Sequence, residues 1–111
     1  NIIRVDRLSG IFEQGRLYVT INQNVDKNSQ HILCKNLMEE YDEFTNIIIC
    51  LYADNNIGRE LARGNDEAVS IEEKKRSWLA MYTFNSVEGE YFDENPSDYL
   101  GNYWNQKFRI K

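Results

Sequence analysis

The sequence predicts a single α+β domain, in which a mostly antiparallel, mixed sheet carries one long and two short helices packed mainly on one face. Three observations lead to this class. Strand-like segments come in adjacent pairs at both ends of the 111-residue chain, as in hairpins. Between the pairs lie one segment of helical periodicity and one nearly continuous apolar run. The length is typical of one domain with one core, so residues 1–111 are expected to form a single globular unit.

The first predicted element is a β-hairpin formed by residues 2–12 and 16–23. Residues 17–21 are rich in β-branched and aromatic side chains, and their apolar positions alternate as in a strand with one buried face. Gly15 is expected to supply a positive φ in the turn. A polar loop at 24–28 follows.

The next predicted element is the long helix, from residue 29 to about residue 43. Ser29 is a suitable N-cap, because its hydroxyl can accept a hydrogen bond from a backbone N–H of the first turn. Leu33, Leu37 and Tyr41 recur at helical spacing and define the buried face. The opposite face is rich in acidic residues, which is typical of a solvated surface.

The apolar run at 46–53 predicts a strand in the centre of the sheet. A strand that is apolar at nearly every position is expected where both faces are covered. The polar residues 54–56 then offer an N-cap for a short helix at 57–63. Gly64 is expected to end that helix.

The C-terminal part predicts a short helix and a second hairpin. Ser70 and Glu73 form a capping-box pattern at the start of a helix that ends near residue 76. Strands are predicted at 77–84 and 90–93, with a turn between them. Residues 103–110 add either an edge strand or an irregular arm. Strict alternation places one set of side chains on a single face: Trp78, Ala80, Tyr82 and Phe84.

Composition argues against several classes of function. The formal net charge is −5, and the one basic run, at 74–76, directly follows two glutamates. Nucleic acid is therefore not expected as a partner, because phosphate binding needs clustered cations on one face. The longest apolar run is only strand-length, so no membrane span is predicted and a soluble, acidic domain is expected. The first residue is not Met, which is compatible with a processed extracytoplasmic protein or a trimmed chain, and the compartment stays open.

No metal or cofactor is predicted from the sequence. Cys34 and Cys50 lack CxxC spacing and a histidine cluster, which argues against zinc. Buried free thiols are favoured, and a disulfide between the two remains the alternative. Oxygen side chains alternate from Asp93 as in a calcium loop, but Asp98 stands where such a loop needs glycine. His31, the single histidine, is expected to be an ordinary residue on the helix surface.

Two regions are candidate binding sites. Asp54 follows the central strand at its carboxyl end and precedes a helix, a location that often lines a ligand crevice in open α/β sheets. The chain has no glycine-rich phosphate loop at that point. Aromatic residues and carboxylates are concentrated between residues 82 and 104, where they form either a core layer or an exposed recognition surface.

Three hypotheses of function follow from these regions. The first is a non-enzymatic domain that uses its aromatic and acidic C-terminal surface to contact a protein or peptide partner. The second is a small enzyme or small-ligand-binding domain centred on the Asp54 end of the central strand. The third is a structural accessory domain of a larger or secreted protein. No catalytic residue is predicted, and the oligomeric state stays open. The predicted binding residues are Tyr91, Asp93, Tyr99, Tyr103, Trp104 and Asp54.

Overall fold

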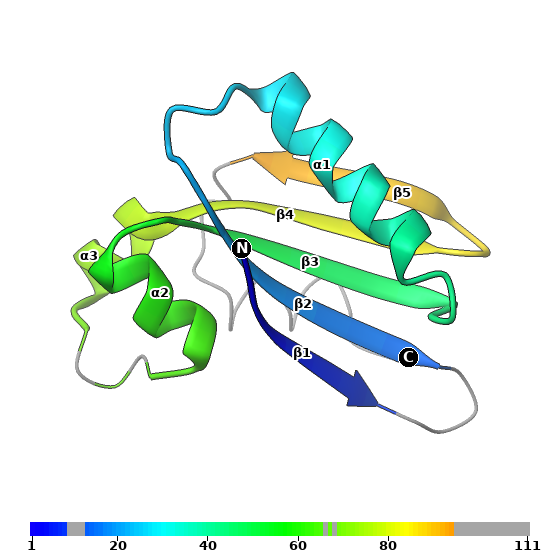
Figure 1. The fold of residues 1–111 in the computed structure, drawn as a ribbon, viewed down its shortest axis with the longest axis horizontal. Coiled ribbons are helices and arrows are strands. Elements are labelled where there is room, and N and C mark those ends of the chain that lie inside the picture. Colours follow the sequence, from blue (N-terminus) through cyan, green and yellow to red (C-terminus); the bar gives the residue numbers. More distant parts are fainter. Residues whose placement is uncertain (9–12, 66, 68, 95–111) are drawn as a thin grey trace.

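A computed structural model describes residues 1–8, 13–65, 67 and 69–94 of the chain. These residues form one α+β domain (Figure 1), as predicted. The predicted order of elements is also confirmed, whereas the strand or arm expected at 103–110 lies outside the described residues. The elements are β1 (Ile2–Leu8), β2 (Gln14–Ile21), α1 (Lys27–Glu40), β3 (Asn46–Ala53), α2 (Asn56–Arg63), α3 (Ile71–Ser77), β4 (Trp78–Asn85) and β5 (Gly89–Glu94).

The five strands form one mixed sheet in the order β1-β2-β3-β4-β5. Strands β2 and β3 are parallel, and α1 is the crossover between them, whereas the other three neighbouring pairs are antiparallel. The central position predicted for β3 is confirmed. Because β2 and β3 run in the same direction, both end at the same edge of the sheet. Helices α2 and α3 lie at that end, on the left of Figure 1.

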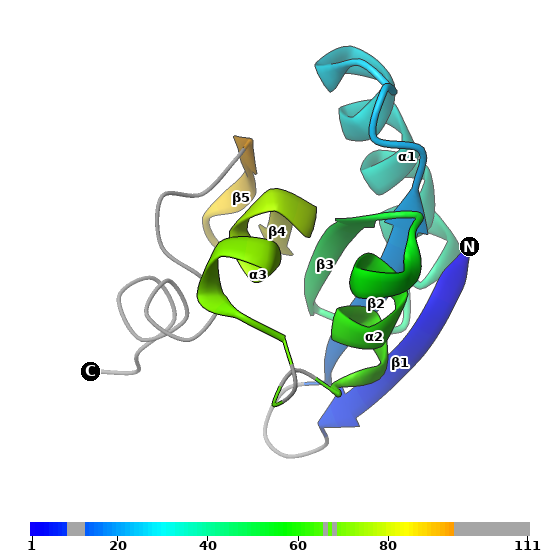
Figure 2. The same ribbon diagram turned by 90° about the vertical axis from the view of Figure 1, so that its left-hand side faces the viewer.

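The helices cover both faces of the sheet, which corrects the expectation that they pack mainly on one. Seven consecutive residues of β3 are buried, so apolar side chains on both of its faces need a cover. Helix α1 covers one face and α2 covers the other, while α3 packs against α2 and β4. Figure 2 shows α2 and α3 in front of the strands at this end. The α1 cluster includes Leu17, Val19, Cys34, Leu37, Ile47, Ile49 and Leu51. The α2 cluster includes Tyr18, Ile48, Cys50, Tyr52, Leu61 and Ala62.

A register shift at the start of β4 corrects the predicted faces of that strand. Leu51 pairs with Ala80, but the next residue of β3, Tyr52, pairs with Trp78. The extra residue on β4 turns Trp78 to the α2 face, where its ring centroid lies 5.2 Å from that of Tyr52. Tyr82 remains on the α1 face and is fully buried.

Gly15 lies inside β2, not in the preceding turn, and its φ is not positive. It pairs with Arg7 of β1 and with Ile47 of β3. A Cβ atom built on Gly15 would overlap the Phe44 ring. The glycine therefore makes room for Phe44, a buried residue of the α1–β3 connection, and does not provide the conformational freedom of a turn.

The helix termini match the sequence patterns at α2 and α3 and differ at α1. Asn55 caps α2, which Gly64 ends with a φ of 91°, and Ser70 closes the predicted capping box of α3. Helix α1 is capped by Asp26, whose Oδ1 accepts a hydrogen bond of 2.7 Å from the backbone N–H of Ser29. Ser29 thus lies within the first turn of the helix.

Cys34 and Cys50 are buried free thiols, as favoured from the sequence. They belong to the two separate clusters on opposite faces of the sheet. Burial raises the pKa of Cys34 to about 12 and also raises that of Cys50. Both are therefore protonated, apolar members of the core at neutral pH.

Candidate functional site

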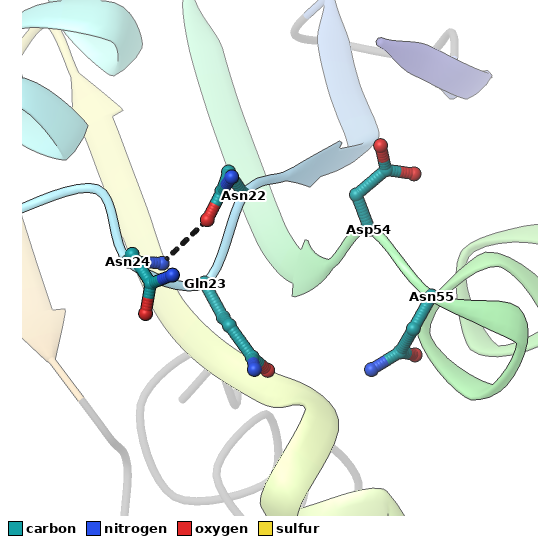
Figure 3. Close-up of a pocket in the computed structure, with 5 residues that line it drawn as sticks. All are labelled: Asn22, Gln23, Asn24, Asp54 and Asn55. Atoms are coloured by element: carbon teal, nitrogen blue, oxygen red, sulfur yellow. Dashed lines mark hydrogen bonds between the residues drawn. The ribbon is translucent and has the colours of Figure 1, made fainter.

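A polar pocket lies at the edge where β2 and β3 both end. Its volume is about 290 Å³, close to the lower end of the range of about 300–1,000 Å³ for small-molecule sites. Two short segments line it, one after each parallel strand, and all of the lining residues are exposed. The pocket is therefore an open depression and not an enclosed cavity. Its lining residues are Asn22, Gln23, Asn24, Asp54 and Asn55 (Figure 3).

Backbone hydrogen bonds hold the two segments together. The N–H of Asp54 donates to the carbonyl of Ile21 at 2.8 Å, which extends the β2–β3 ladder by one bond beyond the strands. Asn22 Oδ1 accepts a hydrogen bond of 2.8 Å from the N–H of Asn24. This bond closes an Asx turn, which orients the loop that follows β2. The walls of the pocket are thus anchored on the sheet.

The start of α2 fixes the position of Asn55. Its Oδ1 accepts a hydrogen bond of 2.7 Å from the N–H of Gly58 and so caps the helix. Gly58 lies directly against the carbonyl of Ala53, where any Cβ atom would overlap the backbone. A larger residue at position 58 would push α2 away from the end of β3, and Asn55 would move with it.

The pocket presents carboxamide groups with unused hydrogen-bonding capacity. Asn22 and Asn55 each use Oδ1 in a local turn or cap, which leaves both Nδ2 groups as donors. The side chains of Gln23 and Asn24 make no hydrogen bond to another described residue, so each offers both a donor and an acceptor. Figure 3 shows the amide groups of Gln23 and Asn55 pointing to the same side of the pocket.

Asp54 stands at the rim of the pocket. Its Oδ1 accepts a hydrogen bond of 2.8 Å from Arg59 Nη1 of α2, and Arg59 Nη2 also donates to Asn56 Oδ1 at 2.9 Å. In Figure 3 its carboxylate points away from the amides of Gln23 and Asn55. An exposed carboxylate already paired with a guanidinium is poorly suited to act as a general base. The open pocket thus lies beside Asp54, which is exposed, and the neighbouring amides form its polar centre.

Tyr91 and Asp93, the other predicted binding residues that the structure describes, do not line this pocket. Tyr91 and Asp93 both lie on β5, where Tyr91 is 48% exposed and Asp93 is half-buried. Tyr99, Tyr103 and Trp104 lie outside the described residues. The structure therefore separates Asp54 from the part of the aromatic and acidic surface that it describes.

A second polar cluster joins α1 to β4 and β5. His31 Nε2 lies 3.0 Å from Glu90 Oε1, and the hydroxyl of Tyr82 donates to Glu90 Oε2 at 2.8 Å. The His31 ring stacks on Phe92, with centroids 5.1 Å apart and planes 12° apart. His31, expected to be an ordinary surface residue, thus links the long helix to the edge strand β5.

The hydrogen bonds of this cluster shift two pKa values in opposite directions. The Tyr82 hydroxyl, and to a lesser extent His31, holds the pKa of Glu90 below its usual value. Burial raises the pKa of Tyr82, and the Glu90 carboxylate raises it further. At neutral pH the cluster therefore contains an ionised Glu90 that accepts a hydrogen bond from a neutral tyrosine.

Metal ligands are not clustered in the described part of the chain. No group of three or more His, Cys, Asp or Glu side chains among those residues lies close enough together to hold an ion. No described helix combines the length and the apolar character needed to cross a bilayer.

Comparison with family models, with curated proteins and with solved structures finds no significant match to this chain.

Asn22, Gln23 and Asn24 were not predicted as site residues. Residues 16–23 were predicted as a strand and 24–28 as a loop, and a parallel pair of strands was not specified. A strand, a 14-residue helix and a buried strand in succession are the pattern of a parallel crossover. That pattern predicts that the segments after β2 and β3 meet at one edge.

Proposed function

We propose that this domain binds a small polar molecule in the pocket at the carboxyl ends of β2 and β3. The observation that carries the proposal is the set of carboxamides with unused donors and acceptors around one depression. In open sheets with parallel strands, ligands bind outside the carboxyl ends of the strands. The location and the chemistry of the pocket thus support the same proposal. We therefore favour ligand binding at the Asp54 end of β3 over the binding of a partner to the aromatic and acidic surface.

The lining residues favour a neutral ligand with adjacent donors and acceptors. Carboxamides both donate and accept, and so they pair with amide groups and with the edges of nucleobases. Among the described residues no aromatic side chain lines the pocket, so none of them stacks on a sugar ring or a base there. The charged residue in this lining, Asp54, is already paired with Arg59. An amide or a pyrimidine-like heterocycle is the class of ligand that fits these groups best.

The proposal is for binding and not for a reaction. In the part of the chain that the structure describes, the lining consists of four carboxamide residues and one paired carboxylate. Carboxamides neither transfer protons readily nor act as nucleophiles, whereas acid–base catalysis needs a group that titrates within reach of the substrate. The chemistry of the lining therefore supports recognition.

Calorimetric titration with uracil, nicotinamide and acetamide tests the proposal, with glucose as a polyol for comparison. At least one of the three amide compounds is expected to bind saturably, and Gln23→Ala is expected to weaken binding at least tenfold. Asn55→Asp is the sharper variant, because it keeps the oxygen that caps α2 and removes the amide donors. Asn36→Ala, an exposed amide on α1, is the matched control. Absence of binding to all three compounds, or equal loss with the control, would contradict the proposal.

A protein or peptide partner that docks on β5 is the second candidate function. The observation that favours it is Tyr91, a tyrosine that is nearly half exposed and lies two residues from Asp93 on the same side of β5. Tyr91→Ala is expected to abolish capture of a peptide partner and to leave the thermal midpoint within a few degrees of that of the unchanged protein. A large loss of stability would instead assign Tyr91 to packing.

A further inference from the structure

Strand β1 forms one edge of the sheet. It pairs with β2 on one side, and in the described ranges no strand pairs with it on the other. An edge strand presents unpaired backbone N–H and C=O groups and is a template for another strand. The side chains of β1 decide whether a second copy of the same chain fits there.

Symmetry limits the ways in which two copies of β1 pair. An antiparallel pair of identical strands has a two-fold axis perpendicular to the sheet. Each side chain of one copy therefore lies opposite a side chain of the second copy that is on the same face of the sheet. Arg4 and Asp6 share the α2 face of the sheet, because they pair with Tyr18 and Arg16 of β2. Val5 lies between them on the α1 face.

Among the registers that pair most residues of β1 with a second β1, only one is electrostatically favourable. An axis at Arg4, Asp6 or Arg7 places two like charges directly opposite each other, which is unfavourable. An axis near Ile3 falls on the register shift in β1. An axis at Val5 instead places each Arg4 opposite Asp6 of the second copy, twice in the same interface. The sequence of β1 is thus self-complementary about Val5.

The charged groups are already placed for this pairing. Arg4 lies over the Tyr18 ring at 4.0 Å and donates to the carbonyl of Arg63 at 3.3 Å, so its side chain is held along the α2 face. Its Nε lies 3.7 Å from Asp6 Oδ1 of the same strand, and both side chains remain more than one-third exposed. A second copy would extend this pair into a cluster of four alternating charges, two on each strand.

We infer that two copies of this chain form a symmetric dimer by antiparallel pairing of β1 with β1 about Val5, which joins two five-stranded sheets into one. The strand is only seven residues long, so the interface is small and the association is weak. Dimers are therefore expected only at high protein concentration.

A charge-exchange experiment tests this register in solution. Asp6→Arg places Arg4 opposite an arginine, and Arg4→Asp places Asp6 opposite an aspartate, so each variant alone is expected to dimerise at least tenfold more weakly. An equimolar mixture restores both cross-strand pairs and is expected to form the heterodimer, measured by sedimentation velocity. Both variants lose the Arg4–Asp6 pair within the chain, so recovery in the mixture reports the contact between copies. Circular dichroism confirms that both variants fold.

Cysteine cross-linking tests the position of the axis. Val5→Cys places two thiols opposite each other at the two-fold axis, where cross-strand Cβ atoms lie about 4.5–5.5 Å apart. This variant is expected to form a disulfide-linked dimer under mild oxidation. Arg7→Cys, on the same strand and face, is the control, because it lies opposite Ile3 of the second copy. Three results overturn the inference: a monomer at 1 mM, single charge variants that dimerise normally, or equal cross-linking of the two cysteine variants.

Discussion

The imidazole Nε2 of His31 lies 3.0 Å from Oε1 of Glu90, 59 residues further along the chain. This contact joins the long helix α1 to β5, the strand at the far edge of the sheet from β1. The His31 ring also covers Phe92, so the contact combines a hydrogen bond with apolar stacking.

The stability of the domain is expected to fall in acid partly through Glu90. The pKa of Glu90 is held below its usual value in the folded state. At a pH above that usual value, the ionised carboxylate therefore stabilises the folded protein. This gain disappears as the pH falls through the lowered pKa. Glu90→Gln is expected to flatten the dependence of the urea midpoint on pH in the acid range below the ordinary pKa of a glutamate. Glu88→Gln, an exposed residue of the preceding turn, is the control, and an equal effect in both variants would refute the assignment.

Removal of the Tyr82 hydroxyl is expected to destabilise the domain without opening a cavity. Tyr82→Phe keeps the fully buried ring but deletes the hydrogen bond to Glu90 Oε2. The expected cost is about 1–2 kcal/mol, since the acceptor is charged and partly exposed. Urea unfolding at pH 7 measures this cost. In the Glu90→Gln background the same change should cost less, and equal costs in both backgrounds would show that the two groups are not coupled.

Gly15→Ala is expected to destabilise the domain because the added methyl group overlaps the Phe44 ring. Such overpacking typically costs about 1–3 kcal/mol. A smaller side chain at position 44 should relieve the overlap, so Gly15→Ala is predicted to cost less in the Phe44→Leu background. Chemical denaturation of the four proteins gives this coupling. Strictly additive costs would mean that the strand moves away from the ring at no expense.

Both thiols are expected to resist labelling in the folded protein. Cys34 and Cys50 are fully buried, and burial raises both pKa values, so neither thiolate nor solvent access is available at pH 8. Ellman's reagent should therefore react with both thiols only at the rate of unfolding, and with two thiols per chain in denaturant. Rapid reaction of one thiol in native buffer would contradict the burial of that cysteine.

The parts of the fold that could be predicted are those set by local sequence. The apolar run of β3, the capping box of Ser70 with Glu73, and Gly64 at the end of α2 each determine a structure within a few residues. The turn before β5 follows the same rule, since Gly89 has the positive φ, 86°, that the turn requires.

The parts that failed depend on contacts between distant segments. From local sequence Gly15 resembles a turn residue, but its role is to make room for Phe44, 29 positions later in the sequence. Trp78 changes face because of a single extra residue in β4, which alternation does not reveal. The pocket belongs to this group too, because Gln23 and Asn55 become neighbours only through the parallel pairing of β2 with β3.

The most direct test of ligand binding at this edge is NMR observation of the side-chain amide groups. ¹⁵N-labelled protein would be titrated with uracil, nicotinamide and acetamide, and the NH₂ signals of Asn22, Gln23, Asn24 and Asn55 would be followed. Ligand binding at this edge should produce saturable shifts of these signals with at least one compound, and little change at Asn36 on α1. Unchanged NH₂ signals with all three compounds, or shifts confined to β5 around Tyr91, would contradict it.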